Sequence, residues 1–540
     1  MKTTILIVLL CVYAVAQDPV HAPPTSLGNT QNIVTGPPST VTGPSTATSG
    51  AAAADPLATC AAASTLTMCD VQSVIQNAIQ SVNVGTLVVA VTDRQGDILG
   101  VYRQAGAPST AVGNLGVSVD SNELAVALAR TTSFFSNDQA PLSSRTVRFI
   151  SGIHFPNGVK FTSSGPLYAI ENTNRGCSFN TNYLPGQALP PATLINGTSP
   201  GLGIITGKAD MLDSNPYAVN PGGVPLFKNG ILVGGVGVTG ATYDITEYAG
   251  VVGSYGAGLG AAPAPPGVVI VGGISLPFVN QKTQPTGTAP GPFTGSYVVG
   301  PVASPGPDPQ GDLIAETAGK VGTLTLSDVQ GIVNAAIANA NQTRAVIRLP
   351  DGARARFVIA ISDLDGNLLA LNRMPDATIF SVDVAVAKSR NVIYFTTHAG
   401  LAGVPVGTAV TNRTIGYGSQ PLFPIGIDYT QPGPFFSLFQ YDTAHPCTQG
   451  PPVTGPGSNG VTFNPANQDG IVFFPGSVPL YKNGVLVGGL GISGDGVDQD
   501  DYVTGQAMAG FEAPLSIQAG QVVIGGVRLP YLSFPRDPTF

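Results

Sequence analysis

Two arginines and two lysines recur in pairs along this sequence, and each of them could bind an acidic group. Arg145 stands in Ser-Arg-Thr and Arg413 in Asn-Arg-Thr, whereas Lys228 and Lys482 each precede Asn-Gly. An arginine fork binds a carboxylate through two parallel hydrogen bonds, and a lysine binds it as a point charge. The recurrence marks these four residues as candidates for holding the acidic groups of a ligand.

Each candidate also has a structural interpretation. Asp93 and Asp363 recur as well and could pair with the two arginines, and the lysines could be solvated residues of a turn. His154, beside Phe155, could bind a metal, or it could be a loop histidine bonded to the backbone. Leu422 stands at the matching position of the second half, so no histidine ligand recurs.

Acidic residues cluster at Asp495, Asp498, Asp500 and Asp501. Oxygen ligands of this kind bind hard cations, but the spacing does not follow the calcium-loop pattern. Carboxylates also collect at helix N-termini, and we favour the start of a helix here. No nucleophile–base pattern, zinc spacing or phosphate loop occurs, so an enzymatic activity is left open but not favoured.

The candidate residues lie in segments that occur twice, in the same order. Such self-similarity indicates two copies of one supersecondary unit. The matching pairs are 65–72 with 323–330, 92–99 with 362–369, 144–146 with 412–414, 224–238 with 478–492, and 272–278 with 525–531.

The elements that must position these residues follow from local patterns. Thr67 with Asp70 predicts a capped helix start, as does Thr325 with Asp328. Next come a hairpin turning at 95–97 (365–367 in the second copy), an alanine-rich helix, and a second hairpin with a Lys-Asn-Gly turn. The order predicts an α+β fold of two tandem modules, each a mainly antiparallel sheet flanked by helices, packed as a pseudo-dimer.

The start of the chain predicts export. Residues 1–16 combine a basic start, a short apolar run and Ala14-Val15-Ala16, which is typical of a signal peptide, with a membrane anchor as the alternative. A Pro/Thr/Gly-rich leader follows at 17–57, then module 1 at 58–280, a Pro/Gly-rich linker at 281–317 and module 2 at 318–540. No later stretch is long and apolar enough to cross a membrane, and we expect a secreted protein.

Composition narrows the partners. Charged residues make up 10% and hydrophobic residues 43% of the chain, with a net charge of −8 and no basic run. A phosphate backbone requires clustered cations, so we expect no nucleic-acid partner. A surface with few charges repels itself weakly, which permits contact with further copies of the protein.

The repeated segments resemble the GlcG/HbpS-like haem-binding family, whose domain also occurs in PduO-type proteins. The resemblance rests on Val91–Leu99, Ser362–Leu369, the helix Val382–Arg390 and both Val-Pro-Leu-[Phe/Tyr]-Lys-Asn-Gly elements with their Gly-Gly strands. It implies a profilin-like fold, self-association and, for some members, bound haem. A haem site would use His154 as a candidate axial ligand and Arg145, Arg413, Lys228 and Lys482 for the propionates.

Two functions follow as hypotheses. The first is an exported haem- or tetrapyrrole-binding protein. The alternative is a non-enzymatic structural protein that assembles with itself into a filament or surface array, which the low charge and the long insertions near 177–221 and 428–475 favour.

The cysteines and sequons complete the candidate sites. If Cys11 leaves with the signal peptide, four cysteines remain, and an exported protein would form two disulfides from them. Cys177 and Cys447 fall in matching insertions, which predicts the pairs Cys177–Cys447 and Cys60–Cys69. Asn196, Asn341 and Asn412 are glycosylation sequons, to be used only if the host modifies exported proteins.

Overall fold

The computed structural model describes residues 63–112, 118–168, 221–260, 269–320, 324–397, 401–444 and 471–539. Several predictions concern residues outside these ranges: the signal peptide and leader, the sequon at Asn196, and Cys60, Cys177 and Cys447. Within the described ranges, no helix has the length and apolar character needed to span a membrane.

Module 1 begins with α2 (Met68–Gln80), and its start and its buried face both match the sequence pattern. The Thr67 hydroxyl accepts from the Asp70 amide at 3.2 Å, and the Asp70 carboxylate accepts from the Thr67 amide at 2.8 Å, which closes the predicted capping box. The apolar side chains at helical spacing are all buried. They are Val71, Val74, Ile75, Ala78 and Ile79.

The sheet of module 1 is antiparallel and has the order β5-β6-β1-β2-β9. Its strands are β1 (Val88–Asp93), β2 (Ile98–Arg103), β5 (Gly223–Lys228), β6 (Ile231–Thr239) and β9 (Ser296–Val299). The helices are α3 (Ser121–Phe135), α4 (Ser144–Phe149) and α5 (Tyr243–Gly256), and short hairpins are formed by β3 (Thr110–Val112) with β4 (Ser118–Asp120) and by β7 (Ile270–Val271) with β8 (Ile274–Ser275).

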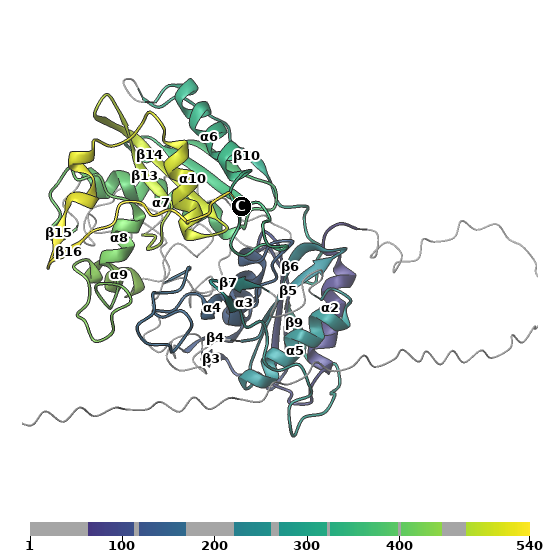
Figure 1. The fold of residues 1–540 in the computed structure, drawn as a ribbon. Helices are drawn as coiled ribbons and strands as arrows, with labels where there is room; N and C mark the ends of the chain where they lie inside the picture. Colours follow the sequence, from purple (N-terminus) through teal and green to yellow (C-terminus); the bar gives the residue numbers. More distant parts are fainter. Residues whose placement is uncertain are drawn as a thin grey trace, which may run out of the picture. The chain divides into compact units, whose positions relative to one another are not determined.

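Side chains alternate between the two faces of the sheet along each strand. Both faces carry apolar side chains, and helices pack on both of them. On β1, Val89 and Val91 pack in one cluster with α2, whereas Val88 and Ala90 pack in another with Ala125 of α3. Figure 1 shows α2 and α5 beside this sheet. The module is therefore a three-layered α/β/α unit.

The glycine-rich strands β6 and, in module 2, β14 bring a helix unusually close to each sheet. A Cβ atom at Gly235 would lie 2.2 Å from the Ala129 carbonyl, and one at Gly237 would lie 2.0 Å from the Ala125 carbonyl, both on α3. In module 2, Gly491 approaches the Ala385 carbonyl in the same way. Any side chain at these positions would push the helix away.

Module 2 repeats the architecture with the order β13-β14-β11-β12-β10. Its strands are β10 (Gly311–Ile314), β11 (Phe357–Ser362), β12 (Leu368–Arg373), β13 (Ser477–Lys482) and β14 (Val485–Gly494). Its helices are α6 (Leu326–Ala340), α7 (Phe380–Thr397), α8 (Asn412–Gly418), α9 (Phe436–Ala444) and α10 (Val497–Ala507), followed by the 3-10 turns η4 (Leu515–Ile517) and η5 (Ala519–Gln521) and the hairpin of β15 (Val523–Ile524) with β16 (Val527–Arg528). The predicted α+β class of two sheets with flanking helices is confirmed.

The segment predicted as a linker, 281–317, also completes both sheets. Its β9 pairs with β2 of module 1, and its β10 pairs with β12 of module 2. It therefore joins the modules along the chain and also supplies each of them with an edge strand.

The modules pack against each other through a shared apolar core and buried ions. Phe135 of α3 stacks on Phe380 of α7 with ring centroids 4.3 Å apart, within a cluster that draws residues from both modules. Arg94 of module 1 contacts Asp376 of module 2 at 2.5 Å, and Arg348 bonds the same carboxylate. Arg94 also lies near Asp138 and Asp308, so these ions form a network that connects the two modules.

Candidate functional site

The two recurring arginines form ion pairs at equivalent places, and Arg145 is buried whereas Arg413 is partly exposed. Arg145 donates from Nε to Glu247 Oε1 at 2.6 Å and from Nη2 to Oε2 at 3.2 Å. Arg413 donates from Nε to Asp501 and from Nη2 to Asp498, two carboxylates in the first turns of α10. The acidic cluster thus begins a helix, as favoured from the sequence, and it also holds Arg413.

The alternative that the two arginines pair with Asp93 and Asp363 was wrong. Both carboxylates instead accept hydrogen bonds within their own hairpin turns. Asp93 accepts from the Asp97 amide at 2.9 Å and from the Ser304 hydroxyl at 2.8 Å. Asp363 accepts from the Asn367 amide at 2.9 Å. Each aspartate therefore stabilises the β1–β2 or β11–β12 turn.

Each of the two recurring lysines binds the carboxylate that caps the first helix of its module. Lys228 donates to the Asp70 carboxylate at 2.8 Å, and Lys482 donates to the Asp328 carboxylate at 2.7 Å. These are the carboxylates of the two capping boxes, so a lysine in a late hairpin turn fixes the start of an early helix. Lys228 is buried, in contrast to the alternative of a solvated turn residue.

His154 connects the two modules. Its Nε2 lies 2.7 Å from Asp428 Oδ1, and both residues are buried. This hydrogen bond is the main cause that lowers the pKa of Asp428. His398 and His445 lie outside the described residues.

The remaining site candidates fall at unrelated places. Asn412 is fully buried, with its side-chain amide bonded to Asn391 and to the Val472 carbonyl, whereas Asn341 caps the C-terminus of α6. Cys69 is in a disulfide, and every other cysteine lies outside the described residues, so the pairing with Cys60 stays a prediction.

An open groove lies in module 1 where β6 ends and α5 begins. It has a volume of about 650 Å³ and lies against the buried face of α3 at Leu124 and Leu128. Ala111 and Val112 of β3 form another wall, and Tyr243 stands at the first position of α5. Burial raises the pKa of the Tyr243 phenol.

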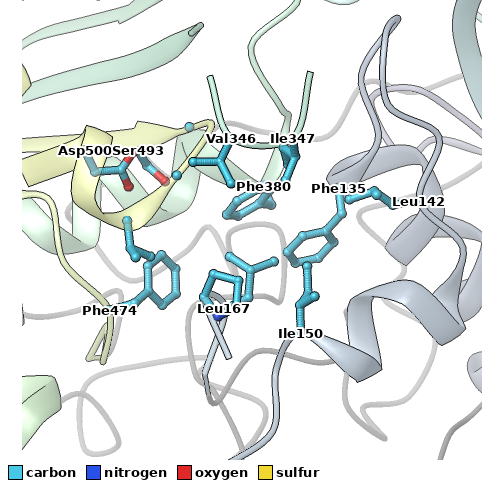
Figure 2. Close-up of a pocket in the computed structure, with 14 residues that line it drawn as sticks. Phe135, Leu142, Ile150, Leu167, Val346, Ile347, Phe380, Phe474, Ser493 and Asp500 are labelled. Carbon is cyan, nitrogen blue, oxygen red and sulfur yellow. The ribbon is translucent and has the colours of Figure 1, made fainter. Parts of the chain in front are cut away.

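The equivalent place in module 2, where β14 ends and α10 begins, is nearly closed. A cavity of only about 30 Å³ remains, and its lining includes Phe380 and Phe474 of module 2. Figure 2 shows Phe135, Leu142, Ile150 and Leu167 of module 1 facing these rings across the cavity. Module 1 thus fills the site of module 2, while its own site stays open.

The two sites differ most in one pair of side chains. In module 2, Lys388 of α7 donates to Asp500 of α10 at 2.9 Å, and both are buried. In module 1, Leu128 and Thr246 stand at the matching positions, because Gly237 contacts Leu128 as Gly491 contacts Lys388. Burial lowers the pKa of Lys388 and raises that of Asp500 to about 7.

Neither Lys388 nor Tyr243 was among the residues predicted for the site. The five predicted residues line neither the groove nor the cavity. One sequence signal could have found Lys388: it is a charged residue on an otherwise apolar, alanine-rich helix face, where a buried partner is required.

The structure predicts that Arg145 contributes to the stability of the fold and not to the binding of a ligand. We expect Arg145→Met to lower the free energy of unfolding by about 2 kcal/mol, because Glu247 keeps its backbone donors Asn280 and Gln281 but loses a charged partner. Urea unfolding would measure this. The matched double variant Arg145→Met/Glu247→Met should recover part of the loss. A ligand affinity that falls while stability is unchanged would contradict this assignment.

Comparisons with known proteins found a matching family model and similar solved structures. Residues 324–509 match the family model described as "Haem degrading protein HbpS-like". Two solved structures are similar at a TM-score of 0.23: a "PduOC:Heme Complex" (22% identity, 36% of this chain, 97% of that one) and Klebsiella pneumoniae protein ORFY of family DUF336 (19%, 37% and 99%). No curated protein matches the chain.

The described chain contains two α+β modules, with an open groove in module 1 and a nearly closed cavity at the equivalent place in module 2. Residues 324–509, within module 2, match the HbpS-like family model, in agreement with the resemblance found in the sequence. Module 1 lies outside that match, and it resembles module 2 in its repeated segments and in its sheet order.

Proposed function

We propose that this is an exported protein that binds haem or a related tetrapyrrole in the open groove of module 1. The carrying observation is the groove itself, whose volume of about 650 Å³ falls within the usual range of small-molecule sites. The cavity of module 2, at about 30 Å³, holds little more than a water molecule. The family description of module 2 supports this ligand class.

The residues of the groove fit a flat apolar ligand whose polar edge stays exposed to solvent. Leu124, Leu128, Ala111 and Val112 would contact the macrocycle, and no lysine or arginine is among the described lining residues. The acidic side chains of the ligand would therefore remain in water at the open mouth. When bound, haem would supply the iron chemistry, and among the described lining residues the phenol of Tyr243 is the axial-ligand candidate.

A haemin titration followed by the Soret band tests the proposal, and we expect one haem per chain. Ala111→Trp would fill the groove and should weaken binding at least tenfold. Thr110→Trp on the same strand is the matched control, because Thr110 is exposed and does not line the groove. The absence of a Soret shift, or equal effects of both variants, would overturn the proposal.

The variant Tyr243→Phe distinguishes ligation of the haem iron by the phenol from a mere contact between the ring and the macrocycle. Ligation by a phenolate releases a proton, so haem affinity should increase with pH in the natural protein and become independent of pH in the variant. A variant spectrum identical to the natural one would remove Tyr243 as a ligand and leave the groove proposal standing.

Export rests on the pattern of residues 1–16 alone. Expression of the full chain in a secreting host should yield an extracellular protein that begins near Gln17. Retention of Met1 in the cell fraction would overturn this part of the proposal.

A further inference from the structure

Two loops at equivalent positions of the modules share one conformation. In residues 155–163, the Phe155 amide donates to the Ser163 carbonyl at 2.8 Å; in residues 423–431, the Phe423 amide donates to the Gln431 carbonyl at 3.0 Å. The hydroxyl of Thr162 bonds the carbonyl three residues earlier at 2.7 Å, and that of Thr430 does the same at 2.8 Å. The loops are therefore a further structural repeat.

These loops contact each other through equivalent residues. The rings of Phe161 and Tyr429, which occupy the same loop position, meet edge to face with centroids 6.0 Å apart. The neighbouring positions also cross over: Lys160 donates to the Tyr429 hydroxyl at 2.7 Å, and Asp428 accepts from the Phe161 amide at 3.2 Å. Contact between equivalent residues defines a local two-fold arrangement.

The contact leaves an exposed apolar surface, which we name the paired aromatic loops. Phe161 is 60% exposed and Tyr429 is 75% exposed, and beside them Val159 and Ile427 are also exposed. Both aromatics have left-handed backbone angles, with φ of 59° and 67°. Such angles are costly for large side chains, and backbone strain of this kind concentrates at functional sites.

We propose that the paired aromatic loops dock a second copy of this chain, loops against loops. The surface continues the interface between the modules, which His154 and Asp428 extend inward. When the same loops of two chains meet face to face, the contact is isologous, and assembly closes at two chains. With only 10% charged residues in the chain, few charges oppose this approach.

This assembly does not depend on haem, because no residue of the paired aromatic loops lines the groove of module 1. It also differs from the contact between the modules, which is formed within one chain. We therefore expect four modules in a particle of two chains, with or without ligand.

Sedimentation velocity over a range of concentrations tests the proposal. The natural chain should sediment as a dimer, and Phe161→Asn/Tyr429→Asn should weaken the dimer at least tenfold. Asparagine tolerates the left-handed backbone angle, so this change removes the rings without adding strain. The matched control is Ile231→Asn/Val485→Asn, two equivalent exposed apolar residues of the late hairpins, and it should leave the dimer intact.

A photo-crosslinking side chain at position 429 of the natural chain gives an answer that needs no stable variant. Cross-links between two chains should join position 429 to residues 155–163 or 423–431 of the second copy. A monomer at every concentration, a dimer lost only in the control variant, or cross-links confined to other surfaces would overturn the proposal. Capture of lipid vesicles by a monomer through these loops would also overturn it.

Discussion

Asp500→Thr should lower the free energy of unfolding by about 3–5 kcal/mol, the usual cost of removing one partner of a buried ion pair. Lys388 is fully buried and would keep only the Ile492 carbonyl at 2.8 Å and the Phe474 ring, whose centroid lies 4.8 Å from Nζ. Neither contact neutralises an ammonium group. The thermal unfolding midpoint of module 2 measures the loss.

Module 1 supplies the compensating change. It has Leu128 and Thr246 where module 2 has Lys388 and Asp500, so the double variant Lys388→Leu/Asp500→Thr transfers a pair that this fold already accommodates. We expect it to recover most of the stability lost in the single variant, because a well-packed apolar pair often replaces a buried ion pair at no cost. A double variant less stable than Asp500→Thr alone would contradict the equivalence of the two sites.

Asp97→Asn should stabilise the protein, with the largest gain above pH 8. Asp97 is fully buried, and neither carboxyl oxygen has a hydrogen-bond partner among the described residues. Burial, followed by repulsion from Asp93, raises its pKa to about 8, and Arg130 only partly opposes this. Burial raises the pKa of Asp93 as well, to about 6, so the two carboxyl groups compete for protons.

The residue of module 2 that is equivalent to Asp97 shows which hydrogen bond a side chain at this position should make. Asn367 stands where module 1 has Asp97, and its side-chain amide donates to the Asp363 carboxylate at 3.0 Å. A protonated Asp97 is the nearest chemical equivalent of that amide. An asparagine in module 1 would therefore supply the donor without a proton, and removing an unsatisfied buried carboxyl should gain about 1–3 kcal/mol.

The pH dependence has a defined sign. Because the folded pKa of Asp97 lies above its unfolded value, the unfolded chain binds fewer protons between about pH 4 and pH 8. The contribution of Asp97 to stability is complete below the unfolded pKa and is lost as pH rises through about 8. Unfolding midpoints measured from pH 5 to pH 9 should fall more steeply in the natural protein than in Asp97→Asn. Parallel curves, or a destabilised variant, would contradict this.

The elements that rest on local physics could be predicted from the sequence. The capping boxes at Thr67 and Thr325, the hairpins and the close glycine strands follow from patterns within a few residues, and the repeat doubles each signal. The start of α10 at the acidic cluster belongs to the same group. In each case the residues that decide the structure are neighbours in the chain.

The site could not be predicted, because its residues meet only after the sheet has formed. Lys388 and Asp500 lie 112 residues apart in the sequence, and Arg145 pairs with Glu247 rather than with Asp93, which is nearer in the sequence. The edge strands β9 and β10 lie in a Pro/Gly-rich segment whose composition predicts a linker. Whether a site is open or filled depends on how the modules pack, and no pattern of neighbouring residues predicts that packing.

Crystals grown with haemin and measured at the iron absorption edge would test most directly which module binds the ligand. If the open groove is the binding site, the anomalous map will contain one iron peak per chain, beside Tyr243 at the start of α5. A peak beside Phe380 and Phe474 at the module interface, or one peak in each module, would contradict the distinction between an open and a filled site.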